Sequence, residues 1–83
     1  MSGLNTEVEH KRETYHVQTQ DLGSGSNCVE TTVYKAGRVL SSRRAYYTSF
    51  LANRALPEKI LELIQGEHAA VIREIEEGKF AHL

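Results

Sequence analysis

The strongest constraint on the fold is the C-terminal segment from Pro57 to Glu77, in which apolar residues recur with the period of an α-helix. At about 100° per residue, its apolar side chains gather on roughly one third of the helix circumference. These residues are Ile60, Leu61, Ile64, Val71, Ile72 and Ile75. Pro57 suits a first helical turn, and Gly78 suits a C-terminal cap. A long amphipathic helix of this kind must bury its apolar stripe against another element.

The middle of the chain alternates apolar or aromatic residues with polar ones, which is the pattern of half-buried strands. We predict strands over residues 14–20, 28–36 and 38–47, joined by a glycine- and serine-rich loop at residues 21–27 and by a turn at Ala36-Gly37. Such connections favour antiparallel neighbours. The expected fold is therefore α+β, a three-stranded antiparallel β-meander followed by one long C-terminal amphipathic helix (β-β-β-α).

The chain has 83 residues, which is the length of one small domain. Its first residues are polar and show no clear pattern, so we expect residues 1–13 to be a flexible N-terminal arm and residues 14–83 to be the single α+β domain. No apolar run approaches the roughly 18 residues of a membrane span, and the N-terminus has no apolar core of a secretory signal. A lone cysteine, Cys28, excludes an internal disulfide. We expect a cytoplasmic protein without membrane contact.

A two-residue turn at Ala36-Gly37 would also set the register of the two strands that it joins. Val33 would then face Leu40, and Tyr34 would face Val39. In the same register Glu30 faces Arg43, and opposite charges across a strand pair attract. This pairing gives Arg43 a structural role without any ligand, whereas a three-residue loop would shift it.

The stretch SSRRAYYTSF, residues 41–50, combines arginines with tyrosines. Strand alternation places Arg44 and Tyr46 on one face, and Arg43 and Tyr47 on the other. Arg38 extends the basic patch only if the register puts it on the same face as Arg44. An uncovered face of this kind suits an anion or a single-stranded nucleic acid. An isoelectric point near 6.4 weighs against nucleic acid. The alternative is that the arginines are solvated and the tyrosines half-buried.

The net charge of −1 conceals an uneven distribution. Residues 28–54 hold five basic residues against one acidic residue, whereas residues 55–83 hold three basic residues against six acidic ones. Such asymmetry can steer an anionic partner to one face or let two copies attract each other. It can also reflect nothing more than a solvated sheet and a solvated helix of different charge.

The four histidines and Cys28 do not have the close, same-face spacing of a zinc site, so we predict no metal and no cofactor. His68 falls in the middle of the apolar helix stripe. A buried histidine needs hydrogen-bond partners, so His68 is first interpreted as a satisfied core or interface residue. The alternatives are a pH-sensitive contact and a general base.

Gly66 lies on the side of the predicted helix opposite the apolar stripe, near Leu63 and Ala70. Small residues at this spacing allow a second helix to approach closely, so these residues are a candidate dimer contact, with His68 as a candidate switch. The alternative is that glycine is simply tolerated at this position.

Several short segments resemble a family of small, often uncharacterised bacterial proteins. They are Tyr15-His16-Val17-Gln18-Thr19-Gln20-Asp21, Gly37-Arg38-Val39-Leu40, Leu63-Ile64-Gln65 with Glu67-His68, and Gly78-Lys79-Phe80. The resemblance spans roughly residues 14–80. It implies a single bacterial domain of this layout, brings no activity with it, and marks His16, Gln18 and His68 as positions of interest. Gln20 and Gly66 depart from the family pattern, which has glutamate and a larger polar residue there.

Taken together, these features predict a non-enzymatic interaction module that forms a homodimer and docks a partner protein through its sheet. The expected binding residues are Arg38, Arg44, Tyr46, His16 and Gln18, and the expected dimer or switch residues are Leu63, Gly66, His68 and Ala70. The alternative is an anion or single-stranded nucleic-acid binder that uses Arg38, Arg44 and Tyr46. The third hypothesis is a small enzyme with His68 or His16 as general base. The identity of the partner is not encoded in any motif.

Overall fold

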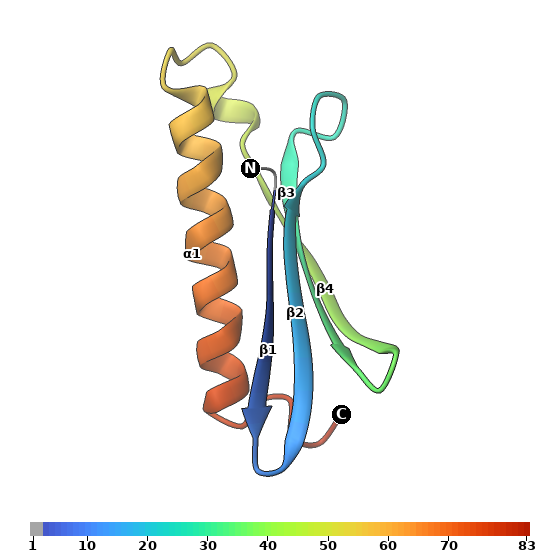
Figure 1. Ribbon diagram of the computed structural model, residues 1–83. Coiled ribbons are helices and arrows are strands. Elements are labelled where there is room, and N and C mark those ends of the chain that lie inside the picture. The colour runs from blue at the N-terminus through green and yellow to red at the C-terminus, as the bar shows by residue number, and fades with distance from the viewer. Residues whose placement is uncertain (1–2) are drawn as a thin grey trace.

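The computed structural model describes residues 3–83, and it shows an open antiparallel sheet with one long helix lying along one face (Figure 1). The elements in chain order are β1 (Gly3–His10), β2 (Glu13–Asp21), β3 (Cys28–Lys35), β4 (Arg38–Tyr46), the short 3-10 helix η1 (Thr48–Phe50) and α1 (Leu56–Glu76). The strands lie in the sheet in the order β1-β2-β3-β4. The predicted α+β class, antiparallel meander and C-terminal helix are confirmed.

Within residues 3–83 the sheet has four strands, so the prediction of three strands was wrong. The additional strand, β1, is formed by a segment that the sequence analysis assigned to a flexible arm; residues 1–2 of that arm lie outside the described residues. Leu4 and Val8 of β1 pack into the core, and the polar residue Thr6 takes the core-facing position between them. With a polar residue at that position and only two large apolar residues among eight, the alternation is too weak a signal for a strand.

Two of the hairpins close through two-residue turns in which both residues have positive φ. These residues are Lys11 (51°) and Arg12 (69°) between β1 and β2, and Ala36 (53°) and Gly37 (77°) between β3 and β4. Positive φ at both central positions defines a type I′ turn, whose twist matches that of the flanking strands. The Ala36-Gly37 turn was predicted. The Lys11-Arg12 turn contains no glycine or asparagine, so the usual signal of this turn is missing from the sequence.

The predicted register of β3 and β4 holds only beside the turn. Tyr34 pairs with Val39 as expected, but the ladder is irregular between Val33 and Tyr34. Leu40 is the extra residue, so Val33 pairs with Ser41 and every later pair is displaced by one residue.

Because of this displacement, the expected ion pair between Glu30 and Arg43 does not form, and that prediction was wrong. Glu30 faces Arg44 rather than Arg43, and Arg43 instead faces Thr31. A bulge of this kind leaves no clear mark in the sequence, because Leu40 fits a strand as well as its neighbours do.

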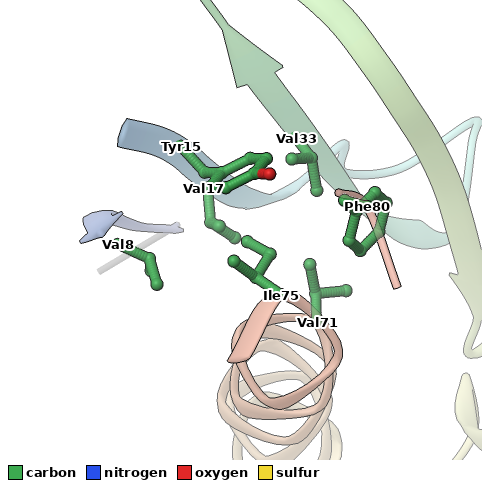
Figure 2. Packing of buried hydrophobic residues seen from close by; sticks show 7 residues of the cluster. All are labelled: Val8, Tyr15, Val17, Val33, Val71, Ile75 and Phe80. Atoms are coloured by element: carbon green, nitrogen blue, oxygen red, sulfur yellow. The ribbon is translucent and has the colours of Figure 1, made fainter. Parts of the chain in front are cut away.

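The core lies between α1 and the sheet, and in residues 3–83 it divides into two apolar clusters. The first cluster consists of Val8, Tyr15, Val17, Val33, Val71, Ile75 and Phe80 (Figure 2). The second consists of Val29, Tyr47 and Ile64 at the other end of the helix. Gly78 (φ 82°) turns the chain back after α1, so that Phe80 packs beside Val71 against the sheet.

Asp21 anchors the loop between β2 and β3. Its carboxylate accepts hydrogen bonds from the backbone N–H of Gly23 (2.9 Å) and from the hydroxyl of Tyr47 (2.7 Å). Burial, reinforced by the bond to Asp21, raises the pKa of Tyr47 to about 12. Tyr47 thus stays neutral and connects the end of β4 to the start of this loop.

The left-handed backbone of the Lys11-Arg12 turn leads to a first prediction. A non-glycine residue in this conformation costs roughly 1–2 kcal/mol, and replacement by glycine removes that cost. Glycine also makes the unfolded chain more flexible, which offsets part of the stabilisation. We expect Arg12→Gly to raise the free energy of unfolding by about 0.5–1 kcal/mol, measured by urea denaturation. The matched control is Arg54→Gly, at an exposed arginine without positive φ, which should lower that free energy slightly. A loss of stability in Arg12→Gly would contradict the assignment of strain to this turn.

Candidate functional site

The side chains on the sheet face turned away from α1 form the candidate functional site. In residues 3–83 no helix or loop lies over this face (Figure 1). We call it the open face and define it, from the strand pairing and the alternation of side chains, by residues Asn5, Glu7, Glu9, Thr14, His16, Gln18, Gln20, Glu30, Thr32, Tyr34, Val39, Ser42, Arg44 and Tyr46. Its side chains are mostly polar, with two tyrosines among them.

A row of side-chain contacts crosses the middle of the open face from β1 to β3. The ring N–H at Nε2 of His16 donates to Oδ1 of Asn5 (3.3 Å), and the edge of the His16 ring meets Tyr34 with centroids 6.2 Å apart. The Tyr34 hydroxyl donates to Oε1 of Gln18 (3.5 Å), whose Nε2 donates to Oε1 of Gln20 (3.5 Å). The row holds the predicted residues His16 and Gln18 in defined positions, although its longer hydrogen bonds are weak.

Arg44 and Tyr46 lie on the open face near its β4 edge. Arg44 donates from Nε to Oε2 of Glu30 (3.1 Å), and this bond raises the pKa of the guanidinium, with a smaller contribution from Tyr46. Tyr46 is 60 % exposed and stands opposite Cys28, which is fully buried. Arg43 points to the other face, as alternation predicted, and forms a two-bond ion pair with Glu74 of α1 (2.9 and 3.2 Å).

Arg38 does not join Arg44 on the open face. It pairs with Lys35, and directly paired residues share a face. The ammonium of Lys35 lies 5.6 Å from the ring centroid of Tyr15, a core residue on the helix side of the sheet. Arg38 therefore belongs to the helix side, and the structure does not bring together Arg38, Arg44 and Tyr46.

The charge of the open face differs from that of the predicted basic strand. The open face carries the carboxylates of Glu7, Glu9 and Glu30, and its guanidinium is that of Arg44. Because Arg44 is already paired with Glu30, the remaining charge is negative and lies on β1. This distribution does not suit a polyanionic ligand such as single-stranded nucleic acid.

His68 lies inside the molecule, between α1 and the sheet. Its Nε2 is 2.8 Å from Oγ1 of Thr6 on β1, and its Nδ1 is 2.9 Å from Oγ1 of Thr19 on β2. Oγ1 of Thr19 is in turn 3.0 Å from Oγ1 of Thr31 on β3. We call this hydrogen-bonded set the His68–threonine chain; it joins the helix to three neighbouring strands. The position of His68 in the apolar stripe was visible in the sequence, but its threonine partners were not.

The His68–threonine chain satisfies the imidazole in its neutral form. Neutral imidazole has one N–H donor and one acceptor nitrogen, and a threonine hydroxyl can serve either of them. Burial lowers the pKa of His68, because the charged form would lose its hydration. A histidine with both nitrogens engaged by core hydroxyls is a structural residue, and it lies on the opposite side of the sheet from the open face.

The four residues predicted as a dimer or switch contact do not form one surface. Leu63 is half-buried against the second apolar cluster, whereas His68 is buried in the interior. Ala70 is half-buried, and Gly66 is exposed, with no described atom within 4 Å of the place where a Cβ would stand. Packing within residues 3–83 therefore does not require glycine at position 66.

A shallow depression of about 270 Å³ lies near the start of α1 and is lined by Phe50, Lys59, Glu62 and Leu63. Its floor is partly apolar, and the Lys59 ammonium lies 5.8 Å from the ring centroid of Phe50. The described residues include no cluster of side chains suited to hold a metal ion. In the same residues, no helix has the length and apolar character needed to cross a membrane.

The lowered pKa of His68 leads to a second prediction. Because the unfolded histidine, with a pKa near 6.5, binds a proton more readily than the buried one, the stabilising contribution is present above about pH 6.5 and is lost as the pH falls below it. We expect the free energy of unfolding to fall by up to about 1.4 kcal/mol per pH unit below that point. His68→Gln, which keeps a donor and an acceptor, should flatten this slope, and His82→Gln, at an exposed position, should not. Equal slopes in the wild type and His68→Gln would contradict the prediction.

This chain matches no known family model, no curated protein and no solved structure. The resemblance of residues 14–80 to a family of small bacterial proteins therefore stays an expectation, and no activity comes with it. What the chain does has to be inferred from its own side chains and their arrangement.

Proposed function

We propose that this chain is a non-enzymatic interaction module, working as a homodimer, that docks a partner protein on the open face of its sheet. The observation that carries the proposal is the ordered row of polar and aromatic side chains on a face that no described element covers. Tyrosine and arginine are the residue types that most often dominate the energy of protein interfaces, and Tyr34, Tyr46 and Arg44 lie on this face.

The open face suits a protein partner because its side chains project from paired strands, whose backbone is fixed before binding. Weak contacts also join His16, Gln18 and Tyr34 to their neighbours. In residues 3–83, no loop or helix then has to become ordered when a partner binds. A sheet face is also broad and flat, which fits the standard interface area of protein complexes better than it fits a small molecule.

The charges define the chemistry of the proposed partner. Glu7 and Glu9 on β1 are exposed, so the partner should present basic groups to that side of the open face. Gln18, Gln20 and Tyr34 require hydrogen-bonding groups at the centre, because polar groups left unpaired in an interface cost binding energy. Tyr46 offers an exposed aromatic ring at the far corner.

The other two hypotheses have less support from the geometry. Arg38 lies on the helix side, which removes one cation from the proposed nucleic-acid site. For the enzyme hypothesis, His68 is engaged by Thr6 and Thr19 in the core, and His16 is engaged by Asn5. The free thiol of Cys28 suits the reducing cytoplasm that we propose as the location.

Capture from an extract of the native host provides the third prediction. We expect Arg44→Ala combined with Tyr46→Ala to reduce retention of a specific partner at least about tenfold, the loss typical of hot-spot residues. Arg38→Ala combined with Leu61→Ala is the matched control, since these exposed residues lie off the open face. A partner that both variants retain equally would contradict docking at the open face.

A labelled single-stranded oligonucleotide separates the proposal from its alternative. We expect no binding at low salt. Binding that weakens steeply with added salt and with Arg44→Ala would instead support the nucleic-acid hypothesis and contradict the proposed function.

A further inference from the structure

Strand β4 is an edge of the sheet, and α1 does not cover it. The sheet order places β3 on one side of β4 and leaves the other side without a neighbouring strand in residues 3–83. The helix packs mainly over β1, β2 and β3 (Figure 1). An uncovered edge presents backbone N–H and C=O groups that can pair with another strand.

We propose that β4 pairs antiparallel with β4 of a second copy of this chain, around a two-fold axis perpendicular to the sheet. The two sheets then become one continuous sheet, with both helices on one side and both open faces on the other. Antiparallel pairing preserves the face of each residue, which is why the open faces stay together. The inference rests on the proposed homodimer and not on docking at the open face.

The apolar residues of β4 support a second copy as the occupant. Val39 and Tyr46 are 53 % and 60 % exposed, and they lie on the open face near opposite ends of the strand. Two antiparallel copies that overlap fully centre on Ser42, the middle residue of β4. We keep the bulge at Leu40 that each chain shows against its own β3. In that register Val39 of one copy lies diagonal to Tyr46 of the other, and the tyrosine ring is long enough to reach it. The contact forms twice, and apolar surface leaves water each time.

The charges at the two edges of the sheet also favour β4. Pairing of β1 with itself would bring together the exposed carboxylates of Glu7 and Glu9 from both copies. On β4, by contrast, Arg43 is neutralised by Glu74 and Arg44 by Glu30. The centre of the proposed interface consists of the small, neutral residues Ser41 and Ser42, so close approach meets neither bulk nor unpaired charge.

Light scattering after size exclusion provides the fourth prediction. We expect wild-type protein to have twice the 9.3 kDa mass of the chain and to dissociate on dilution. Val39→Lys combined with Tyr46→Lys should weaken the dimer at least about tenfold, because like charges would meet across the two-fold axis. Leu61→Lys, at an exposed apolar residue of α1, should leave the mass unchanged, and circular dichroism verifies that each variant is folded. A strict monomer up to millimolar concentration would overturn the proposed homodimer and its interface together.

A cross-linking experiment tests the interface itself, even if the charged variants fail to fold. Ser42→Cys places two thiols opposite each other at the axis, where paired Cα atoms lie about 4.5–5.5 Å apart, close enough for a disulfide. We expect mild oxidation to produce a covalent dimer, while the native Cys28 stays unreacted because it is buried. The control is Glu7→Cys on β1, which should stay monomeric under denaturing electrophoresis.

The remaining outcomes each overturn the β4 interface. One is cross-linking of Glu7→Cys alone, which indicates pairing through β1. Another is cross-linking only in a mixture of the two variants, which indicates head-to-tail pairing of β1 with β4. A dimer that persists without any cross-link and is weakened by Gly66→Ala would assign the contact to the helix. None of these results affects docking at the open face, which is tested by partner capture.

Discussion

The burial of one helix on one face of the sheet is the contact on which the rest of this structure depends. A helix with its side chains is about 10–12 Å wide, and neighbouring strands lie about 4.8 Å apart, so one helix covers about three strands. In a sheet of four strands, α1 therefore lies over β1, β2 and β3 and leaves β4 uncovered. The same geometry leaves the second face of the sheet open within the described part of the chain. The two surfaces that we propose for binding follow from the presence of a single helix in residues 3–83.

The His68–threonine chain fixes where the helix lies on the sheet. Apolar contacts between α1 and the strands are non-directional, and they would tolerate a slide of the helix along the sheet. The hydrogen bonds of His68 oppose such a slide. A shift of the helix by one turn would separate the His68 ring nitrogens from Thr6 and Thr19 and leave buried polar groups unpaired. The His68–threonine chain lies between the two apolar clusters, so it divides the core and fixes where each cluster lies. We infer that His68, interpreted from the sequence as a satisfied core or interface residue, serves mainly to specify the fold.

The parts of the fold that could be predicted from sequence are those in which local signals agree. Helix α1 has a proline near its start, an apolar stripe and a glycine after its end, and β2, β3 and the Ala36-Gly37 turn have alternation and a favourable turn residue. Strand β1 was missed because its turn, Lys11-Arg12, is stabilised by the pairing of β1 with β2 and not by residues that favour positive φ. The bulge at Leu40 was missed because it depends on how β4 packs in three dimensions. Of the candidate site, alternation correctly separated Arg43 from Arg44, but the partners of both arginines depended on that bulge and on the distant residue Glu74.

The uneven charge of the sequence acquires a different meaning once the chain is folded. The basic middle and the acidic end suggested attraction of an anion or of a second copy. In the structure, Arg43 of the basic segment meets Glu74 of the acidic one, and Arg44 meets Glu30 of its neighbouring strand. Lys35, also basic, lies against Glu13. Much of the apparent positive charge is thus used within the chain, which leaves exposed carboxylates on β1 and, on β4, an edge that is neutral at its centre and carries the exposed Arg38 at its start. A neutral edge favours pairing with an identical strand, and an acidic, hydrogen-bonding face favours a protein partner with basic groups. The internal ion pairs therefore give the two proposed surfaces different chemistry, although the surfaces meet at Val39 and Tyr46 on β4.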